Sequence, residues 1–304
     1  MRCVLCLVLL SGVIGCGDAS NTEMRTPATP EIDAGPYDDY FEGGGVLKPD
    51  SIGLVIRDVR FFGRNEDGTT DGFDLDGHTS QSGEAASCGH ADTTDSEGRE
   101  GIDNQLGAAW DNLLEPVVGE ATHALIKGAI NEGRLLLGIE LSKLDDAMNA
   151  KSAELFFFKA LADPDVGTRG LISPDQTYYV DTDGPMSVIE SVEMTHGSLT
   201  AGPVEFDIPI DILDEYFIVT VADARIRLQV NEDGSATGLI GGIIDVAALL
   251  DEGYETNAAQ EFRLVTPFFF SNTDMWPDDS GQCRGMSVAI RVEATPGFIV
   301  HPAQ

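Results

Sequence analysis

The stretch Ala224-Arg225-Ile226-Arg227-Leu228-Gln229-Val230 alternates strictly between apolar and polar side chains. A period of two puts the apolar side chains on one face of an extended chain, so this stretch predicts a β-strand with one buried and one solvated face. The run Asn231-Glu232-Asp233-Gly234 follows it, and Leu239–Ile244 is a second apolar segment soon after. An Asp-Gly turn between two such segments is typical of a β-hairpin.

Most of the chain after Arg134 has the same character, with short apolar segments bounded by Gly, Pro, Asn or Asp. This spacing is expected of a sandwich or a barrel, and it predicts a mainly β fold, a β-sandwich or barrel-like domain. Two segments that contain phenylalanine triplets do not alternate, which predicts strands covered on both faces. The further predicted strands are Ser51–Ile56, Val59–Phe62, Leu135–Leu141, Ala153–Ala160, Gln176–Val180, Met186–Met194, Ser198–Thr200, Val204–Ile208, Phe217–Ala222, Glu261–Phe270 and Met286–Glu293.

Helical spacing of apolar residues occurs in three places. The first runs from Ile102 to Pro116 and the second covers Glu120–Ile130, while a shorter one lies around Val246–Leu250. Apolar residues three and four apart share one face of a helix, so each segment can bury one side. The first two segments predict a small two-helix layer over about residues 102–131.

The chain begins with a positive residue, Arg2, and the apolar run Cys3–Ile14. As a helix this run would span only ~18 Å, against ~30 Å for a hydrocarbon core, so it predicts an export signal rather than a membrane span. Its end, Val13-Ile14-Gly15-Cys16, resembles the lipobox of bacterial lipoproteins. The resemblance implies that residues 1–15 are a lipoprotein signal peptide, that cleavage occurs before Cys16, and that Cys16 carries a lipid anchor. An ordinary secretory signal with an incidental cysteine is the alternative.

Residues 16–45 mix Ser, Thr, Pro and acidic side chains without periodicity and end in three glycines. This composition predicts a flexible, acidic and disordered tether, which as a random coil would hold the following domain roughly 30 Å from the membrane. The β-rich globular domain is then expected over residues 46–304.

The charge of the chain is strongly negative. Asp and Glu number 52 against 18 Lys and Arg, which gives a formal net charge of −34. Such a polyanion is repelled by nucleic-acid phosphates, so no nucleic acid is expected as a partner. The excess of carboxylates has two interpretations, a solubility adaptation or the binding of cations.

The five cysteines divide by position. Cys3 and Cys6 leave with the signal peptide and Cys16 takes the lipid, so Cys88 and Cys283 remain as a single pair. In an oxidising compartment this pair predicts a disulfide, with two free thiols as the alternative. The chain contains no CxxC motif, so neither a redox motif nor a structural zinc site is indicated.

Residues 65–104 form an acidic segment with eleven carboxylates and one basic residue, Arg99. Calcium takes six to eight hard oxygen ligands, which a loop can supply from alternating acidic side chains. The start of the segment resembles an EF-hand or dockerin loop, but Gly63 stands at the first ligand position, where such loops have Asp. Asp67-Gly68 also has a near copy in Asp233-Gly234 and likewise follows a predicted strand, so we assign it to a β-hairpin turn rather than to a metal.

The later copy of the turn has no counterparts of Asp71, Asp74 and Asp76, which follow the first copy. These three aspartates are therefore better candidate ligands than Asp67. More distant carboxylates could fold back over them. Mutual repulsion within the segment favours a bound cation, with calcium as the candidate cofactor, while a solvated acidic loop is the alternative. The candidate metal ligands are Asp71, Asp74, Asp76, Asp92 and Asp103.

The segment also carries a longer pattern. Asp71-Gly72-Phe73-Asp74-Leu75-Asp76-Gly77, then Cys88 and Asp92, then Gly101-Ile102-Asp103-Asn104-Gln105-Leu106 resembles a signature of uncharacterised lipoproteins of myxobacteria and their relatives. The resemblance implies a Gram-negative source and a lipid-anchored protein of the cell envelope, at the cell surface or in the periplasm. We expect the outer membrane, with the inner membrane as the alternative. The resemblance implies no activity and therefore no catalytic residues.

Motifs for catalysis are lacking. The five histidines are scattered without an HExxH motif, and neither a phosphate loop nor a dinucleotide fingerprint occurs. The run Gly281-Gln282-Cys283-Arg284-Gly285 has the spacing of a nucleophile elbow, but a strand is predicted after it where that motif needs a helix. We therefore expect a non-enzymatic binding or structural module of the envelope, held by its lipid, with a protein or glycan as partner. An envelope-facing glycoside hydrolase or carbohydrate-binding β-sandwich is the alternative, since a catalytic pair of carboxylates is recognisable only from its separation in space.

Overall fold

A computed structural model describes residues 45–47, 50–110, 119–212 and 215–302. The predicted signal peptide (1–15), the lipidation site Cys16 and all but the last residue of the predicted tether (16–45) lie outside the described residues. So does most of the second half of the first predicted helix.

The described part of the chain is mainly β, as predicted. Its strands are β1 (Gly45–Leu47), β2 (Ile52–Arg60), β3 (Leu137–Ser142), β4 (Ala150–Leu161), β5 (Gln176–Val180), β6 (Met186–Thr195), β7 (Ser198–Ile212), β8 (Glu215–Val230), β9 (Ala236–Asp245), β10 (Met275–Pro277) and β11 (Cys283–Pro302).

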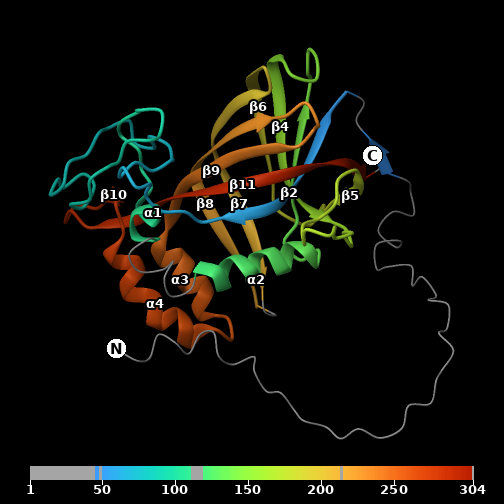
Figure 1. Ribbon diagram of the computed structural model, residues 1–304. Coiled ribbons are helices and arrows are strands. Elements are labelled where there is room, and N and C mark those ends of the chain that lie inside the picture. Colours follow the sequence, from blue (N-terminus) through green and yellow to red (C-terminus); the bar gives the residue numbers. More distant parts are fainter. Residues whose placement is uncertain (1–44, 48–49, 111–118, 213–214, 303–304) are drawn as a thin grey trace, which may run out of the picture.

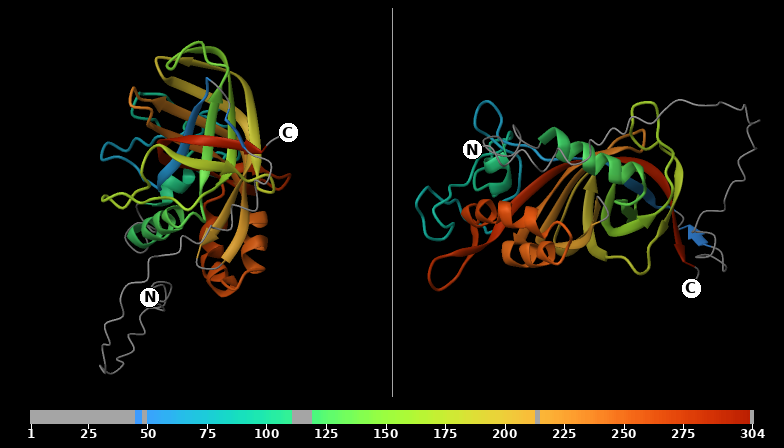
Figure 2. Two further views of the ribbon diagram at one scale, coloured as in Figure 1. Left: turned by 90° about the vertical axis from the view of Figure 1, so that its right-hand side faces the viewer. Right: turned by 90° about the horizontal axis from the view of Figure 1, so that it is seen from below.

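The strands form one antiparallel meander that closes on itself (Figures 1 and 2). Neighbours pair in the order β2, β3, β4, β6, β7, β8 and β9. The long strand β11 then pairs with β9 along Gly285–Ala294 and with β2 along Arg291–Pro296. The result is the barrel-like alternative among the predicted folds.

Apolar side chains fill the inside of the closed sheet. Ile226, Leu228 and Val230 of β8 are buried there, as the alternation predicts, together with residues of every other strand of the meander. Close-packed side chains, rather than a channel, occupy the inside of a barrel of this size. This core provides a rigid base for the segments outside it.

Four helices lie in the described residues: α1 (Gln105–Ala109), α2 (Glu120–Asn131), α3 (Val246–Tyr254) and α4 (Ala259–Ser271). Helix α2 packs against β2 and β7 and buries Ile126, Ala129 and Ile130 in the core. Helices α3 and α4 pack on each other beside the sheet (Figure 1). None of the described helices combines the length and the apolar character that crossing a membrane requires.

The predicted strand Glu261–Phe270 is wrong, because this segment belongs to helix α4. Its phenylalanines favoured a strand by propensity, but Phe262 and Phe269 are seven residues apart and lie on one helical face, against the core cluster that contains Val246. Gly253 makes room for this packing, since a Cβ there would come within 2.2 Å of the Phe262 ring. The sequence of this segment is compatible with a strand by residue propensity and with a helix by the spacing of its phenylalanines. Tertiary packing favours the helix.

Several predicted strands are halves of longer ones. Ser198–Thr200 and Val204–Ile208 both belong to β7, and the register of β7 and β8 shifts between Ala201 and Val204. The register of β8 and β9 shifts in the same way between Ala222 and Arg225. The predicted interruptions are therefore β-bulges, which bend a strand without ending it.

The two copies of the Asp-Gly turn have the same internal hydrogen bonds. The amide of Asn231 donates to the carbonyl oxygen of Ser235 at 2.8 Å, and that of Asn65 to Thr69 at 2.7 Å. The later copy joins β8 to β9, which confirms the predicted hairpin. The hairpin predicted for the earlier copy is wrong, because among the described residues it follows β2 without leading into a paired strand. The turn forms there from its own side chains, with the amide and hydroxyl of Thr69 donating to Asp67.

Candidate metal centre

The acidic segment lies outside the closed sheet, near β10 (Figure 1). Two arginines of β8 hold it there: Arg225 donates to the backbone carbonyl oxygens of Asp74 and Leu75, and Arg227 to that of Gly72. The polar face of β8, predicted to be solvated, is therefore partly covered. A neutral backbone oxygen accepts these hydrogen bonds, so the arginines leave the carboxylates of the segment free for other partners.

A disulfide and a small apolar cluster complete this attachment. Cys88 is bonded to Cys283 across 195 residues, with the two Cα atoms 5.9 Å apart, so the predicted disulfide is present. Phe73 and Leu75 are buried in a cluster with residues of β9 and β10. The segment is thus fixed to the sheet at several separate points.

Within the segment, backbone pairing brings distant aspartates together. Phe73 forms an antiparallel bridge with Asp103, and Thr93 one with Ile102. As a result Asp74, Asp76 and Asp103 each offer a carboxylate oxygen, and these oxygens lie within 4.8 Å of one another.

Each of the three carboxylates also accepts a hydrogen bond from a backbone amide through one of its oxygens. Asp74 accepts from Gly77 at 2.6 Å, and Asp76 accepts from His78 at 2.8 Å. Asp103 accepts from Leu75, also at 2.6 Å. These hydrogen bonds fix the three side chains, and Asp103 in addition shares a side-chain hydrogen bond with Asp92.

Asp92 is adjacent to this cluster, and its carboxylate accepts a hydrogen bond from the amide of Ser80 at 2.6 Å. Burial raises the pKa of Asp92 above its ordinary value, and the charge of Asp76 acts in the same direction. Burial raises the pKa of Asp103 to about 8, to which the charges of Asp92 and Asp76 contribute. Asp103 is only 4% exposed, so water cannot screen this repulsion well.

Among the described residues, no Lys, Arg or His side chain forms an ion pair with Asp74, Asp76, Asp92 or Asp103. Buried carboxylates are ordinarily paired with a base or bound to a metal. Asp103 is the buried member of this set, so a proton or a metal ion is expected to neutralise it.

The structure separates Asp71 from the other predicted ligands. Its carboxylate pairs with Arg291 of β11 at 2.9 Å and accepts from Ser96 at 2.9 Å. Burial opposes ionisation of Asp71, but these hydrogen bonds outweigh it and lower its pKa. Asp71 thus serves to attach the segment to the sheet.

Sequence reasoning missed Asp274, a buried neighbour of the cluster. Burial raises the pKa of Asp274 to about 7, although Ser287 hydrogen bonds to both its oxygens. The charge of Asp274 also raises the pKa of Asp103. Asp274 precedes β10, far from the acidic segment in the chain, and no motif marks it.

The oxygen positions suit a calcium ion. Calcium–oxygen distances are ~2.3–2.6 Å, so two ligand oxygens on opposite sides of one ion are up to ~5 Å apart. The spacing of at most 4.8 Å therefore allows the three carboxylates to contact one ion together. The cluster contains neither cysteine nor histidine, which zinc and copper prefer.

No protein-family model matches the chain, and neither a curated protein nor a solved structure matches it.

Proposed function

We propose that this protein is a lipid-anchored, non-enzymatic module of the cell envelope whose acidic segment binds calcium. The observation that carries the calcium site is the convergence of Asp74, Asp76 and the buried Asp103 without a basic partner among the described residues. The lipobox-like end of the signal and the acidic tether support the anchored location. The disulfide supports an oxidising compartment.

In this proposal calcium is structural. Asp103 comes from the far end of the acidic segment and Asp74 from its first half, so one ion bound to both closes the segment on itself. Calcium sites of extracellular modules have dissociation constants of about 10⁻⁴–10⁻³ M, which suits a site with few carboxylates completed by backbone oxygens and water. The ordered segment then presents a defined surface to a protein or glycan partner.

Calcium titration of the full-length chain at pH 8 tests the site. The readouts are the heat of binding, measured by calorimetry, and the melting temperature. We expect a rise of roughly 5 °C at saturating calcium, because an ion that binds only the folded state stabilises it. The double variant Asp74→Asn/Asp76→Asn should lose this rise, because it removes two of the three converging carboxylates.

The matched control is Glu66→Gln/Glu100→Gln, which removes the same charge from exposed positions of the same segment. This variant should keep the full response. If the wild type gives neither heat nor a higher melting temperature at millimolar calcium, the calcium site is refuted. An equal loss in both double variants would refute a specific site and indicate general screening of negative charge.

A further inference from the structure

A cleft of about 400 Å³ lies between the acidic segment and the outer face of the closed sheet. The acidic segment contributes one wall, which contains Asp71, Ser96, Glu97 and Arg99. Strands β8, β9 and β11 contribute the opposite side, which contains Arg227, Leu239 and Arg291. None of the three carboxylates that converge in the candidate metal centre lines this cleft. The cleft therefore needs an explanation of its own.

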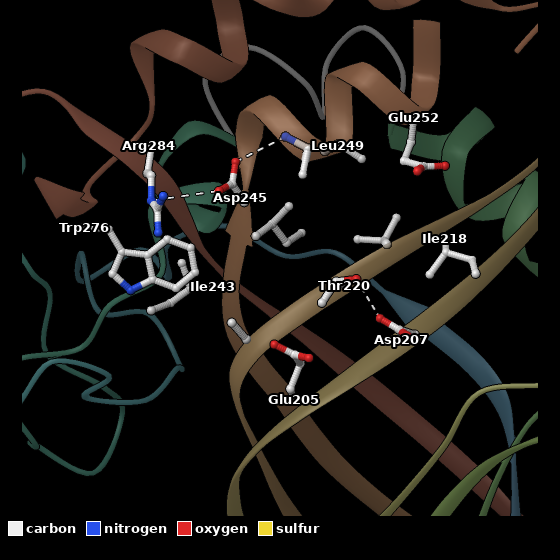
Figure 3. A pocket seen from close by; sticks show the side chains of 14 residues that line it. Glu205, Asp207, Ile218, Thr220, Ile243, Asp245, Leu249, Glu252, Trp276 and Arg284 are labelled. Atoms are coloured by element: carbon white, nitrogen blue, oxygen red, sulfur yellow. Dashed lines mark hydrogen bonds and ion pairs between the residues drawn. The ribbon is translucent and has the colours of Figure 1, made fainter. Parts of the chain in front are cut away.

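The charges that line the cleft are unusual for so acidic a molecule. A larger cavity, of about 550 Å³, has the ordinary pattern: one basic residue, Arg284, and four acidic ones line it, namely Glu205, Asp207, Asp245 and Glu252 (Figure 3). The cleft has the opposite balance, with three arginines and two carboxylates. In a chain with a net charge of −34, this local excess of positive charge favours an anionic ligand.

Strand register brings two of these arginines to the same place. Arg227 of β8 pairs with Leu239 of β9, and Leu239 pairs in turn with Arg291 of β11. Directly opposite residues on neighbouring strands point to the same face of a sheet. Neighbouring strands are ~4.8 Å apart, so the Cα atoms of Arg227 and Arg291 are separated by about 10 Å across the buried Leu239. Two long guanidinium side chains at this separation can contact one ligand.

Aromatic rings hold both of these guanidinium groups in position. The Cζ atom of Arg227 lies 5.0 Å from the centre of the Phe73 ring. The Cζ atom of Arg291 lies 4.2 Å from the centre of the Phe62 ring. Such stacking is favourable for arginine and limits the motion of its side chain. The two groups therefore lose little conformational freedom when a ligand binds.

The third arginine is fixed by a buried carboxylate. Arg99 donates through Nε to Asp95 at 2.6 Å, and the side chain of Asp95 is fully buried. The amides of Glu97 and Arg99 donate to the same carboxylate at 3.0 and 2.9 Å. These hydrogen bonds outweigh burial and lower the pKa of Asp95. The turn that carries Arg99 is thus held together from inside.

Arg227 differs from the other two arginines because it lacks a carboxylate partner. Arg291 pairs with Asp71 at 2.9 Å, and Arg99 pairs with Asp95. Within the described part of the chain Arg227 forms no ion pair, and its hydrogen bond to the carbonyl oxygen of Gly72 is long, at 3.4 Å. Burial lowers the pKa of Arg227, and the charge of Arg99 acts in the same direction. A partly buried cation next to a second cation is stabilised by an anion.

We propose that the cleft binds the carboxylate of a uronic acid residue, as in an acidic polysaccharide. The carboxylate accepts hydrogen bonds from Arg227, and the planar guanidinium group suits both of its oxygens. The single unpaired positive charge matches the single negative charge of a carboxylate, whereas a phosphate dianion would carry an excess. Neutral polar side chains complete the lining and can bind the sugar hydroxyls: Ser96, Ser198, Gln229 and Thr237. This site goes beyond the calcium proposal and uses other residues.

Calorimetry on the full-length chain, with calcium present and about 150 mM salt to screen general attraction, tests this proposal. The probes are methyl β-D-glucuronoside, its neutral analogue methyl β-D-glucoside, and N-acetylglutamate amide, which has a carboxylate but no sugar hydroxyls. We expect the glucuronoside to bind and the glucoside not to bind. The glutamate derivative should bind at least tenfold more weakly than the glucuronoside.

Two variants with matched controls test the residues. Arg227→Gln should weaken glucuronoside binding at least tenfold, and its control, Arg169→Gln, removes the same charge from an exposed position outside the cleft. Because Arg227 also packs on Phe73, the second variant leaves this contact intact: Thr237→Glu adds a negative charge at an exposed position of the cleft. It should weaken binding at least tenfold at an unchanged melting temperature. Its control, Thr168→Glu, makes the same change at an exposed position outside the cleft and should bind as the wild type does.

Three results would overturn the proposal: absence of glucuronoside binding, equal binding of the glucoside, or equal weakening by a cleft variant and its control. Equally tight binding of the glutamate derivative would overturn the assignment to a uronic acid and identify a peptide carboxylate as the ligand.

Discussion

At the scale of single residues, Asp103 is the most informative side chain. It is buried, its neighbours Asp76 and Asp92 are acidic, and its one described hydrogen-bond donor is the amide of Leu75. A single amide cannot offset burial next to two like charges, so the ionised form is unfavourable in the absence of a cation. Protons and metal ions therefore compete for the same group.

This competition predicts a dependence of stability on pH. The unfolded chain holds Asp103 near its ordinary pKa of 3.8, and the folded chain holds it at about 8. Between these values the folded state binds the extra proton, so with a chelator present stability should fall as the pH rises from about 4 to 8. We expect the melting temperature to drop by roughly 5 °C between pH 5 and pH 8.

With calcium in excess the trend should reverse, because the ion binds only the ionised carboxylates and its affinity rises with pH. Asp103→Asn isolates the contribution of this residue, since the amide oxygen can still accept from Leu75. The variant should melt higher than the wild type at pH 8 in chelator and gain nothing from calcium. A chelated wild type whose melting temperature rises steadily to pH 8 would contradict this account.

The sequence could identify Asp74, Asp76 and Asp103 together with the adjacent Asp92, but not Asp274, for a physical reason. Asp74 and Asp76 are close in the chain, and Asp103 lies in the same acidic segment, so composition alone made them candidates. Asp71 has the same chemistry, but Arg291 of a distant strand pairs with it. Asp274 lies next to β10 and approaches the cluster only in the folded structure, where its charge acts on Asp103. The local sequence around Asp274 cannot predict a contact between such distant segments.

At the scale of elements, β8 shows how much an alternating pattern can predict. Its buried face was predicted residue by residue, because a period of two admits only one assignment. Its polar face was misjudged, because arginine suits water and a covering loop equally well. Helix α4 was misjudged for a related reason: phenylalanine suits both strands and buried helical faces, and packing against α3 decided the outcome.

The covering role of β8 can be tested with Arg225→Met, which keeps most of the side-chain volume and removes the donors to Asp74 and Leu75. Two carbonyl oxygens in partly buried hydrogen bonds then lose their partner, so we expect a loss of about 1–2 kcal/mol in the free energy of unfolding. Calcium should also bind more weakly, because the loop that carries Asp74 is less ordered. Chemical denaturation and calcium titration measure the two effects.

Arg169→Met, at an exposed position between β4 and β5, is the control for Arg225→Met, with an expected change within about 0.5 kcal/mol. Equal effects of the two substitutions would show that loss of positive charge, rather than attachment of the loop, is responsible.

The disulfide joins the acidic segment to the first residue of β11 and closes a loop of 195 residues. In the chain-entropy model such a loop contributes about 5 kcal/mol at most, and measured losses on removal are typically about 2–5 kcal/mol. We expect Cys88→Ser/Cys283→Ser to lose an amount in this range, and non-reducing mass spectrometry of the wild type to show one linked peptide. Two thiols that react with an alkylating agent in the unreduced protein would contradict the bond.

At the scale of the whole molecule, the net charge of −34 and the proposed anchor act together. A strongly anionic domain is repelled by anionic lipid surfaces, so attachment to a membrane has to come from elsewhere. Replacing Cys16 with serine should therefore move the protein from the membrane fraction to the soluble fraction. Continued sedimentation of this variant with membranes would show that another part of the chain is the anchor.

The pairing of β9 with β11 affects how neighbouring molecules can interact when many copies of the protein are crowded together. A strand at the edge of an open sheet exposes unpaired backbone groups, to which a second molecule can add a strand and begin to aggregate. In the described part of this protein both ends of the meander pair with β11, so the two principal edges are used up within one molecule. Molecules tethered side by side on one membrane would meet at a high local concentration, and this pairing removes the outer edges of β2 and β9 as places where a neighbouring molecule could add a strand.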